Sequence, residues 1–129
     1  MTGPTRKTEP SPARRAAFAR GVDAEAAAGA VLATQGFAVL ATRVRTARGE
    51  IDLIARRDDL VVFVEVKARA RLDTAAEAVS PRQRRRIAAA AEIYLAGHPE
   101  LAGLDMRFDA ILIAPGAPAL HLPGAFEAE

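Results

Sequence analysis

Two apolar segments separated by four charged residues constrain the fold of this chain more than any other feature. Residues 50–55 and 60–67 each have the length and apolar content of a β-strand, and only residues 56–59 lie between them. So short a connection favours an antiparallel hairpin, in which the loop length fixes the register of the two strands.

Two acids and a lysine lie where these predicted strands face each other. Residues two apart on a strand share a face at a spacing of roughly 6.6 Å, so Glu65 and Lys67 point the same way. A two-residue turn at Asp58-Asp59 would place Asp52 directly opposite Glu65, and a four-residue loop would make the two acids diagonal neighbours on one face. A three-residue loop would place them on opposite faces.

A pair of opposed carboxylates needs a compensating cation, because like charges across a strand pair destabilise each other. Hard oxygen ligands suit Mg²⁺ or Mn²⁺, which keep several waters and also bind substrate phosphate. A lysine such as Lys67 can orient or help to deprotonate an attacking water, or can stabilise negative charge on a scissile phosphate. The pattern therefore indicates a metal-dependent nuclease.

The alternative is a set of charges on a solvated sheet face, with Glu50 and Lys67 as a cross-strand ion pair. Both faces of the predicted hairpin are nevertheless largely apolar. One face carries Ile54, Val61 and Phe63 beside the acids, and the other carries Ile51, Leu53, Val62, Val64 and Val66. We therefore expect both faces to be covered and the charges to collect at one end of the sheet.

Glu25 is a further candidate acid, in a predicted helix that begins at the N-cap candidate Asp23 and stops at Gly36. Small and apolar residues three, four and seven positions later share its face, so this carboxylate points along a surface suited to packing on the sheet. A carboxylate on such a surface needs a partner. The alternatives are that Glu25 is favoured by the helix dipole in the first turn, or that it pairs with a nearby arginine.

The remaining periodicity predicts an α/β architecture, a mixed sheet with helices on both sides. The expected elements are a helix over 16–35, strands over 37–45, 50–55 and 60–67, a helical turn near 74–78, a helix over 81–96, and strands over 106–114 and 119–122. Ser80-Pro81 supplies an N-cap followed by proline at the first helical position.

Several motifs resemble those of the bacterial YraN-like family over residues 16–126, in the order and spacing of that family. They are Gly21-Val22-Asp23-Ala24-Glu25, Arg45, Gly49-Glu50-Ile51-Asp52-Leu53-Ile54-Ala55, Val62-Phe63-Val64-Glu65-Val66-Lys67, Arg69, Arg107-Phe108-Asp109 and His121-Leu122-Pro123-Gly124-Ala125-Phe126. The family belongs to the restriction-endonuclease-like PD-(D/E)xK superfamily and is similar to archaeal Holliday junction resolvases. The resemblance implies a restriction-endonuclease-like fold and a Mg²⁺-dependent, structure-selective DNA endonuclease.

The resemblance also implies a role for each site residue. Asp52 and Glu65 become metal ligands together with the main-chain carbonyl of Val66, and Lys67 activates the water. Glu25 becomes the helix-borne acid that reaches the same metal, directly or through water. All four side chains are thus candidate catalytic residues.

Basic residues flank these motifs, although the net charge is only +2, with 18 basic against 16 acidic residues. The candidate nucleic-acid contacts are Arg43, Arg45, Arg69, Arg82, Gln83 and Arg85. Arg43 and Gln83 depart from the family, which often has asparagine and lysine there. Such clusters can neutralise phosphates, and the absence of interleaved aromatic residues favours recognition of duplex backbone or shape. The alternative for each arginine is a solvated helix face.

Length and composition set the remaining expectations. The 129 residues, half of them apolar, suffice for one domain over 16–126, with tails over 1–15 and 127–129. The first tail is rich in proline, threonine and charge and has no apolar core, so it reads as disordered rather than as a signal peptide. Without cysteines, thiolate metal sites are excluded, and no segment could span a membrane. A cytoplasmic protein is expected.

The sequence thus predicts a Mg²⁺-dependent endonuclease, with Mn²⁺ as a second metal, that hydrolyses phosphodiester bonds in duplex or branched DNA such as Holliday junctions. Junction cleavage would require a homodimer with paired sites. The competing prediction is a non-catalytic DNA-binding module or a partner of a DNA helicase with the same fold. An RNA nuclease is a third class, because phosphate contacts do not read the 2′-hydroxyl.

Overall fold

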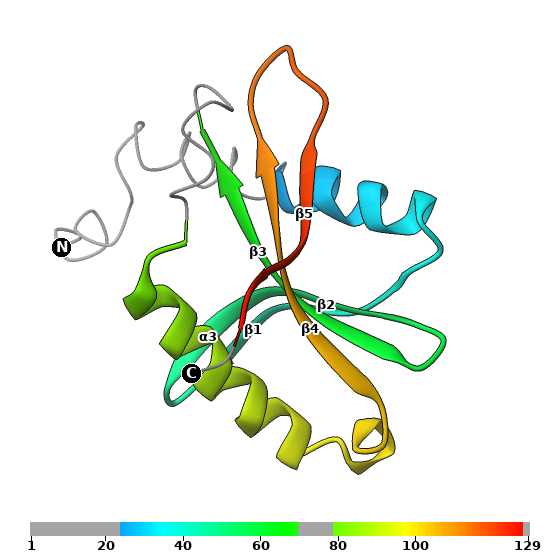
Figure 1. Cartoon of the computed structure of the whole chain (residues 1–129), viewed down its shortest axis with the longest axis vertical. Helices are drawn as coiled ribbons and strands as arrows, with labels where there is room; N and C mark the ends of the chain where they lie inside the picture. Colours follow the sequence, from blue (N-terminus) through cyan, green and yellow to red (C-terminus); the bar gives the residue numbers. More distant parts are fainter. Residues whose placement is uncertain (1–23, 70–78, 128–129) are drawn as a thin grey trace, which may run out of the picture.

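The fold is a five-stranded mixed sheet with one helix on each face, in a computed structural model that describes residues 24–69 and 79–127 (Figure 1). The strands are β1 (Ala38–Thr46), β2 (Gly49–Arg57), β3 (Leu60–Ala68), β4 (Asp105–Ile113) and β5 (Leu120–Phe126), and they lie in this order across the sheet. Only β3 and β4 are parallel. The predicted α/β architecture is confirmed.

The helices agree with the predicted pattern where the structure describes them. A helix over 24–34 packs on one face of the sheet, and α3 (Pro81–Ala96) packs on the other, followed by the short 3₁₀ helix η2 (Pro99–Leu101). The start of the first helix, the turn expected near 74–78, the tail over 1–15 and the last two residues lie outside the described residues. Within the described ranges, no helix combines the length and apolar character that crossing a membrane requires.

The β2–β3 hairpin has the two-residue turn among the three possible loops. Arg57 pairs with Leu60, and the register continues to Leu53 opposite Val64. Asp58 has a φ of 53°, a left-handed conformation that two-residue hairpin turns require and that aspartate tolerates better than most residues. Continued by one pair, this register places Asp52 opposite Glu65, although hydrogen-bonded pairing has already ended.

The two faces of the hairpin are buried as the alternation predicts, with one exception. Ile54 and Phe63 lie in the core beneath α3, whereas Leu53 lies in the core beneath helix 24–34. Ile51 was expected beside Leu53, and that expectation is wrong, because it packs in the α3 core. Strict alternation is lost beyond the end of the β2–β3 ladder at Leu53, where Arg43 of the neighbouring β1 has a φ of 52°.

The first turn of α3 is held by reciprocal capping. The Ser80 hydroxyl accepts a hydrogen bond from the backbone N–H of Gln83, and the Gln83 side-chain oxygen accepts one from the backbone N–H of Ser80. Pro81 occupies the first helical position, as predicted. Together these contacts satisfy backbone donors that a helix start leaves without partners, and they fix where α3 begins.

A buried carboxylate joins β4 and β5 on the face that helix 24–34 covers. Asp109 is fully buried and accepts hydrogen bonds from Arg107, His121 Nε2 and the backbone N–H of Gly124. Burial alone would raise the pKa of Asp109, but these donors hold the pKa below its usual value. The other ring nitrogen of His121 contacts Gln35 at 3.1 Å, so this histidine has a structural position.

Gly49 allows α3 to approach the turn between β1 and β2. A Cβ atom at this position would lie 2.6 Å from the carbonyl oxygen of Arg86, closer than real Cβ contacts come. Glycine is therefore required where the hairpin meets the helix backbone, and this contact sets the height of α3 above β2.

Replacing Gly49 with alanine should lower the free energy of unfolding by roughly 1–3 kcal/mol, because either the β1–β2 turn or α3 must move. Urea unfolding monitored by circular dichroism measures this change. Gly103→Ala is the matched control, since a Cβ there meets no atom within 4 Å. Equal stability of the two variants would show that the close contact is not required.

Candidate active site

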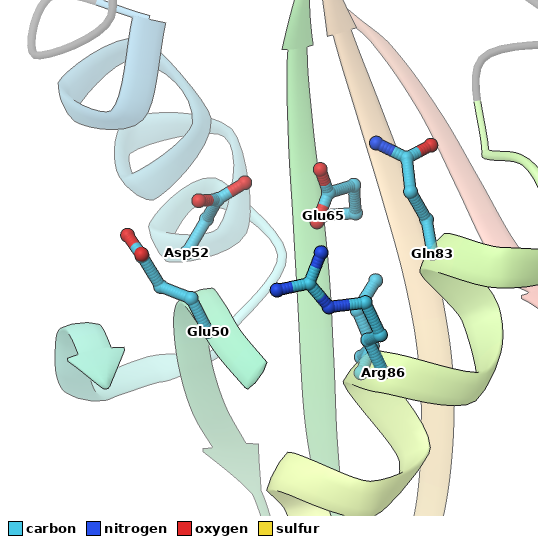
Figure 2. Close-up of a pocket in the computed structure, with 6 residues that line it drawn as sticks. Glu50, Asp52, Glu65, Gln83 and Arg86 are labelled. Carbon is cyan, nitrogen blue, oxygen red and sulfur yellow. The ribbon is translucent and has the colours of Figure 1, made fainter. Parts of the chain in front are cut away.

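A pocket of about 260 Å³ lies where β2 and β3 separate beneath the first turns of α3. Its lining residues are Glu50, Asp52, Glu65, Gln83, Arg86 and Ile87. Figure 2 shows the carboxylates of Asp52 and Glu65 on neighbouring strands, with Arg86 and Gln83 reaching toward them from the helix. The structure thus brings the two predicted strand acids into one pocket.

Asp52 occupies the point at which the β2–β3 ladder stops. The backbone N–H of Val66 donates a hydrogen bond of 2.8 Å to Asp52 Oδ2, whereas the last paired residues are Leu53 and Val64. A side-chain carboxylate therefore accepts from β3 where the main chain of β2 no longer pairs with it. This contact orients the carboxylate and keeps the strand ends open toward the pocket.

The electrostatics of Asp52 are unfavourable without a cation. Burial raises the pKa of Asp52 most, the charge of Glu65 raises it further, and the Val66 N–H opposes both; the result is a pKa of about 7. Glu25 adds to the rise and Lys67 reduces it. A positive charge that entered the pocket would stabilise the ionised form of this carboxyl group.

Lys67 pairs with Glu65 and not with Glu50. Its ammonium nitrogen lies 3.1 Å from Glu65 Oε1, and both side chains are largely buried, with 14% and 13% of their surface exposed. Glu50 instead lies 3.9 Å from Arg45, at the surface. The alternative of a solvated Glu50–Lys67 pair is therefore wrong, and the lysine is held at the acid that lines the pocket.

Glu25 lies outside this pocket. It accepts a hydrogen bond of 2.8 Å from Arg43 Nε, so the expected alternative of an arginine partner is found. The pair lines a separate hollow of about 470 Å³, on the sheet face that includes Leu53. Among the described residues, no three acidic, histidine or cysteine side chains are grouped closely enough to hold a metal by themselves.

The side chains of the candidate DNA contacts differ in their exposure and in their partners within the protein. Arg45, Arg69, Arg82 and Arg85 are exposed. Arg43 is partly buried and engaged with Glu25, and the Gln83 side-chain oxygen is used in capping Ser80. Because that oxygen faces Ser80, the Gln83 amide nitrogen is turned away from the cap, and it lies on the Glu65 side in Figure 2.

Two charged residues of the pocket were not among the predicted site residues. Glu50 and Arg86 both line the pocket. A signal for Arg86 was present, because it lies three residues after Gln83 and so shares its helix face. Glu50 lies two residues before Asp52 on the predicted strand and therefore shares its face.

The sequence is similar to a family model and to individual proteins of that family. A family model described as uncharacterised protein family UPF0102 matches residues 24–113. A UPF0102 protein of Azorhizobium caulinodans is 62% identical over 122 residues, which cover 92% of this chain and 93% of the relative. One from Rhodopseudomonas palustris is 58% identical over 125 residues, with 96% of each chain covered.

A solved structure shares the fold. Hjc of Archaeoglobus fulgidus, a Holliday junction resolvase from an archaeal hyperthermophile, superposes with a TM-score of 0.52. The match covers 85% of this chain and 79% of the resolvase chain at 19% sequence identity. At so low an identity, the likeness shows the fold alone, which is the restriction-endonuclease-like fold that the motifs predicted.

The raised pKa of Asp52 makes the stability of the metal-free protein depend on pH. The folded state keeps a proton up to a pKa of about 7, whereas the unfolded state loses it near the ordinary aspartate pKa of 3.8. Stability should therefore fall as pH rises between these values, by at most roughly 1.4 kcal/mol per unit for this group.

Urea unfolding in EDTA, at about pH 5 and about pH 8, measures this effect against Asp52→Asn, which keeps an acceptor for Val66. The asparagine variant should gain stability relative to the wild type on going to the higher pH. Parallel pH profiles for the two proteins would contradict a raised pKa.

Proposed function

Because the chain belongs to uncharacterised protein family UPF0102, the YraN-like family, we propose from its site that it is a Mg²⁺-dependent DNA endonuclease. The observation that carries the proposal is the convergence of Asp52 and Glu65 in one pocket, with Lys67 held 3.1 Å from Glu65. Two acids and a lysine form the minimal set for hydrolysis of a phosphodiester by water.

The donor set fits a hard divalent cation. Asp52 and Glu65 offer carboxylate oxygens in the pocket, the main-chain carbonyl of Val66 would add a third oxygen, and no thiolate exists in the chain. Two protein carboxylates suffice for Mg²⁺, which takes its other ligands from water and substrate phosphate; Mn²⁺ accepts the same oxygens. When bound, the cation would supply Lewis-acid polarisation of the phosphate and of water.

Each side chain of the site would have its own role in the reaction. Asp52 and Glu65 would hold the cation, and Asp52 is already oriented by the Val66 N–H. Lys67 would position or deprotonate the attacking water, or donate to the phosphate oxygens. Glu25, which now pairs with Arg43, would act on the same metal through water after that ion pair opens.

A nucleic acid is the proposed substrate because exposed arginines lie on the elements that border the pocket, and DNA is proposed because the solved structure with the same fold is a Holliday junction resolvase. Arg82 and Arg85 lie on α3 beside the pocket residues, Arg45 contacts Glu50, and Arg69 follows the end of β3. These side chains would bind phosphates in a salt-dependent manner. The proposed substrate is branched DNA, such as a four-way junction. We propose that the protein acts on it in the cytoplasm, as a homodimer with paired sites and with a helicase as partner.

Labelled four-way junction, flap, single-stranded and linear duplex DNA should be incubated with the protein in Mg²⁺ or Mn²⁺. Metal-dependent cutting is expected, and Asp52→Asn and Lys67→Ala should each reduce the rate by about 100-fold or more, because each removes a group that acts on the phosphate or its metal. Binding of DNA should persist in both variants. An RNA copy of the preferred substrate tests for ribonuclease activity.

The contrary outcome is equally informative. Failure of the wild-type protein to cut any substrate with either metal, together with tight and salt-sensitive junction binding, would show a non-catalytic binding module. Cutting that survives both substitutions would place the active site elsewhere.

Metal binding has its own readout. Mg²⁺ should raise the melting temperature of the wild type, since a ligand that binds only the folded state stabilises it by about 2.7 kcal/mol at a hundredfold excess over Kd. Differential scanning fluorimetry with and without EDTA measures the shift, and Asp52→Asn should show little of it. An equal shift in both proteins would exclude Asp52 as a ligand.

A further inference from the structure

We propose that Arg86 contacts the scissile phosphate, an assignment that rests on the nuclease function proposed above. Arg86 is a lining residue of the pocket that contains Asp52 and Glu65, and it belongs to α3. In Figure 2 its guanidinium extends from the helix toward the gap between the two carboxylates. A guanidinium in that position could contact a phosphate that enters the pocket of the acid pair.

The backbone of Arg86 is held in place although its side chain is exposed. Its carbonyl oxygen abuts Gly49, where no Cβ could fit, and the next residue, Ile87, is only 3% exposed in the core. The capping box at Ser80 fixes the start of the same helix. The structure thus pre-positions the base of this side chain, as a residue that must meet a substrate atom requires.

The acids of the pocket already have other partners. Glu65 pairs with Lys67 and Glu50 with Arg45, while Asp52 accepts from the Val66 N–H. Within residues 24–69 and 79–127, no ion pair involves Arg86. The Arg86 guanidinium therefore lies at an acidic pocket without forming an ion pair with its acids.

A phosphate is the ligand that this arrangement fits. The planar guanidinium can donate two parallel hydrogen bonds to phosphate oxygens, which a point charge such as an ammonium cannot do. A cation held by Asp52 and Glu65 would remove the negative charge that repels an anion from the pocket. The Arg86 guanidinium would then stabilise the negative charge that develops on the phosphate during hydrolysis, in addition to the Lewis-acid effect that the cation would supply.

Arg86→Ala should reduce the single-turnover rate of DNA cleavage in Mg²⁺ by about 100-fold at saturating DNA, with partial recovery in Arg86→Lys and on adding free guanidinium. In Ca²⁺, fluorescence anisotropy should show DNA binding with a salt slope reduced by about one. Circular dichroism and urea unfolding should be unchanged, because the side chain is exposed.

Arg56→Ala is the charge-matched control. Arg56 lies four residues from Asp52 along β2, roughly 13 Å away, and donates to the carbonyl of Asp58 in the distal turn. This variant should cleave within about twofold of the wild-type rate, since the catalytic effect of a phosphate contact is lost only where the contact is made.

The outcomes separate the two proposals. A wild-type protein that cuts DNA, with Arg86→Ala cutting at the same saturated rate, would overturn the role of Arg86 and leave the nuclease function standing. Weaker binding by Arg86→Ala without any loss of saturated rate would assign Arg86 to general backbone binding and also overturn the role. A wild-type protein that cuts nothing would overturn both proposals.

Discussion

The register of the β2–β3 hairpin is the constraint on which the rest of the site depends. The two-residue turn at Asp58-Asp59 pairs Arg57 with Leu60, and every later pair follows from that one. A shift of one residue would send Glu65 to the face covered by helix 24–34. Asp52 and Glu65 share a pocket because a turn several residues away permits only this alignment.

The end of the β2–β3 ladder determines the environment of these two acids. Continued main-chain pairing would close the strands, but Asp52 accepts from the Val66 N–H with its side chain and leaves the strand ends apart. The same position buries the carboxylate beside Glu65, which raises its pKa to about 7. An uncharged side chain at either position would remove this electrostatic cost from the metal-free protein.

The sequence predicted the local features of the fold. Alternation and loop length predicted the hairpin, and Ser80-Pro81 predicted the start of α3, because these features depend on neighbouring residues. The face of Ile51 was mispredicted, since alternation fails beyond the end of the β2–β3 ladder, next to the positive φ of Arg43 in β1. The arginine partner of Glu25 was one of the expected alternatives, and the choice between them depends on how helix 24–34 docks on the sheet. The entry of Arg86 into the pocket depends on how α3 docks, through the Gly49 contact with the Arg86 backbone, which periodicity does not show.

The separation of Glu25 from the acid pair determines from which side a substrate would arrive. Glu25 and Arg43 line a hollow with Leu53 on the face of helix 24–34, whereas the acid pair opens beneath α3. Glu25 nevertheless lies close enough to Asp52 for its charge to raise the pKa of that carboxyl group. The exposed arginines of α3 lie on the side of the acid pocket. Under the proposed function, a phosphate backbone would therefore approach over α3 and the β1–β2 turn, and Glu25 would reach the metal only after its ion pair with Arg43 opens.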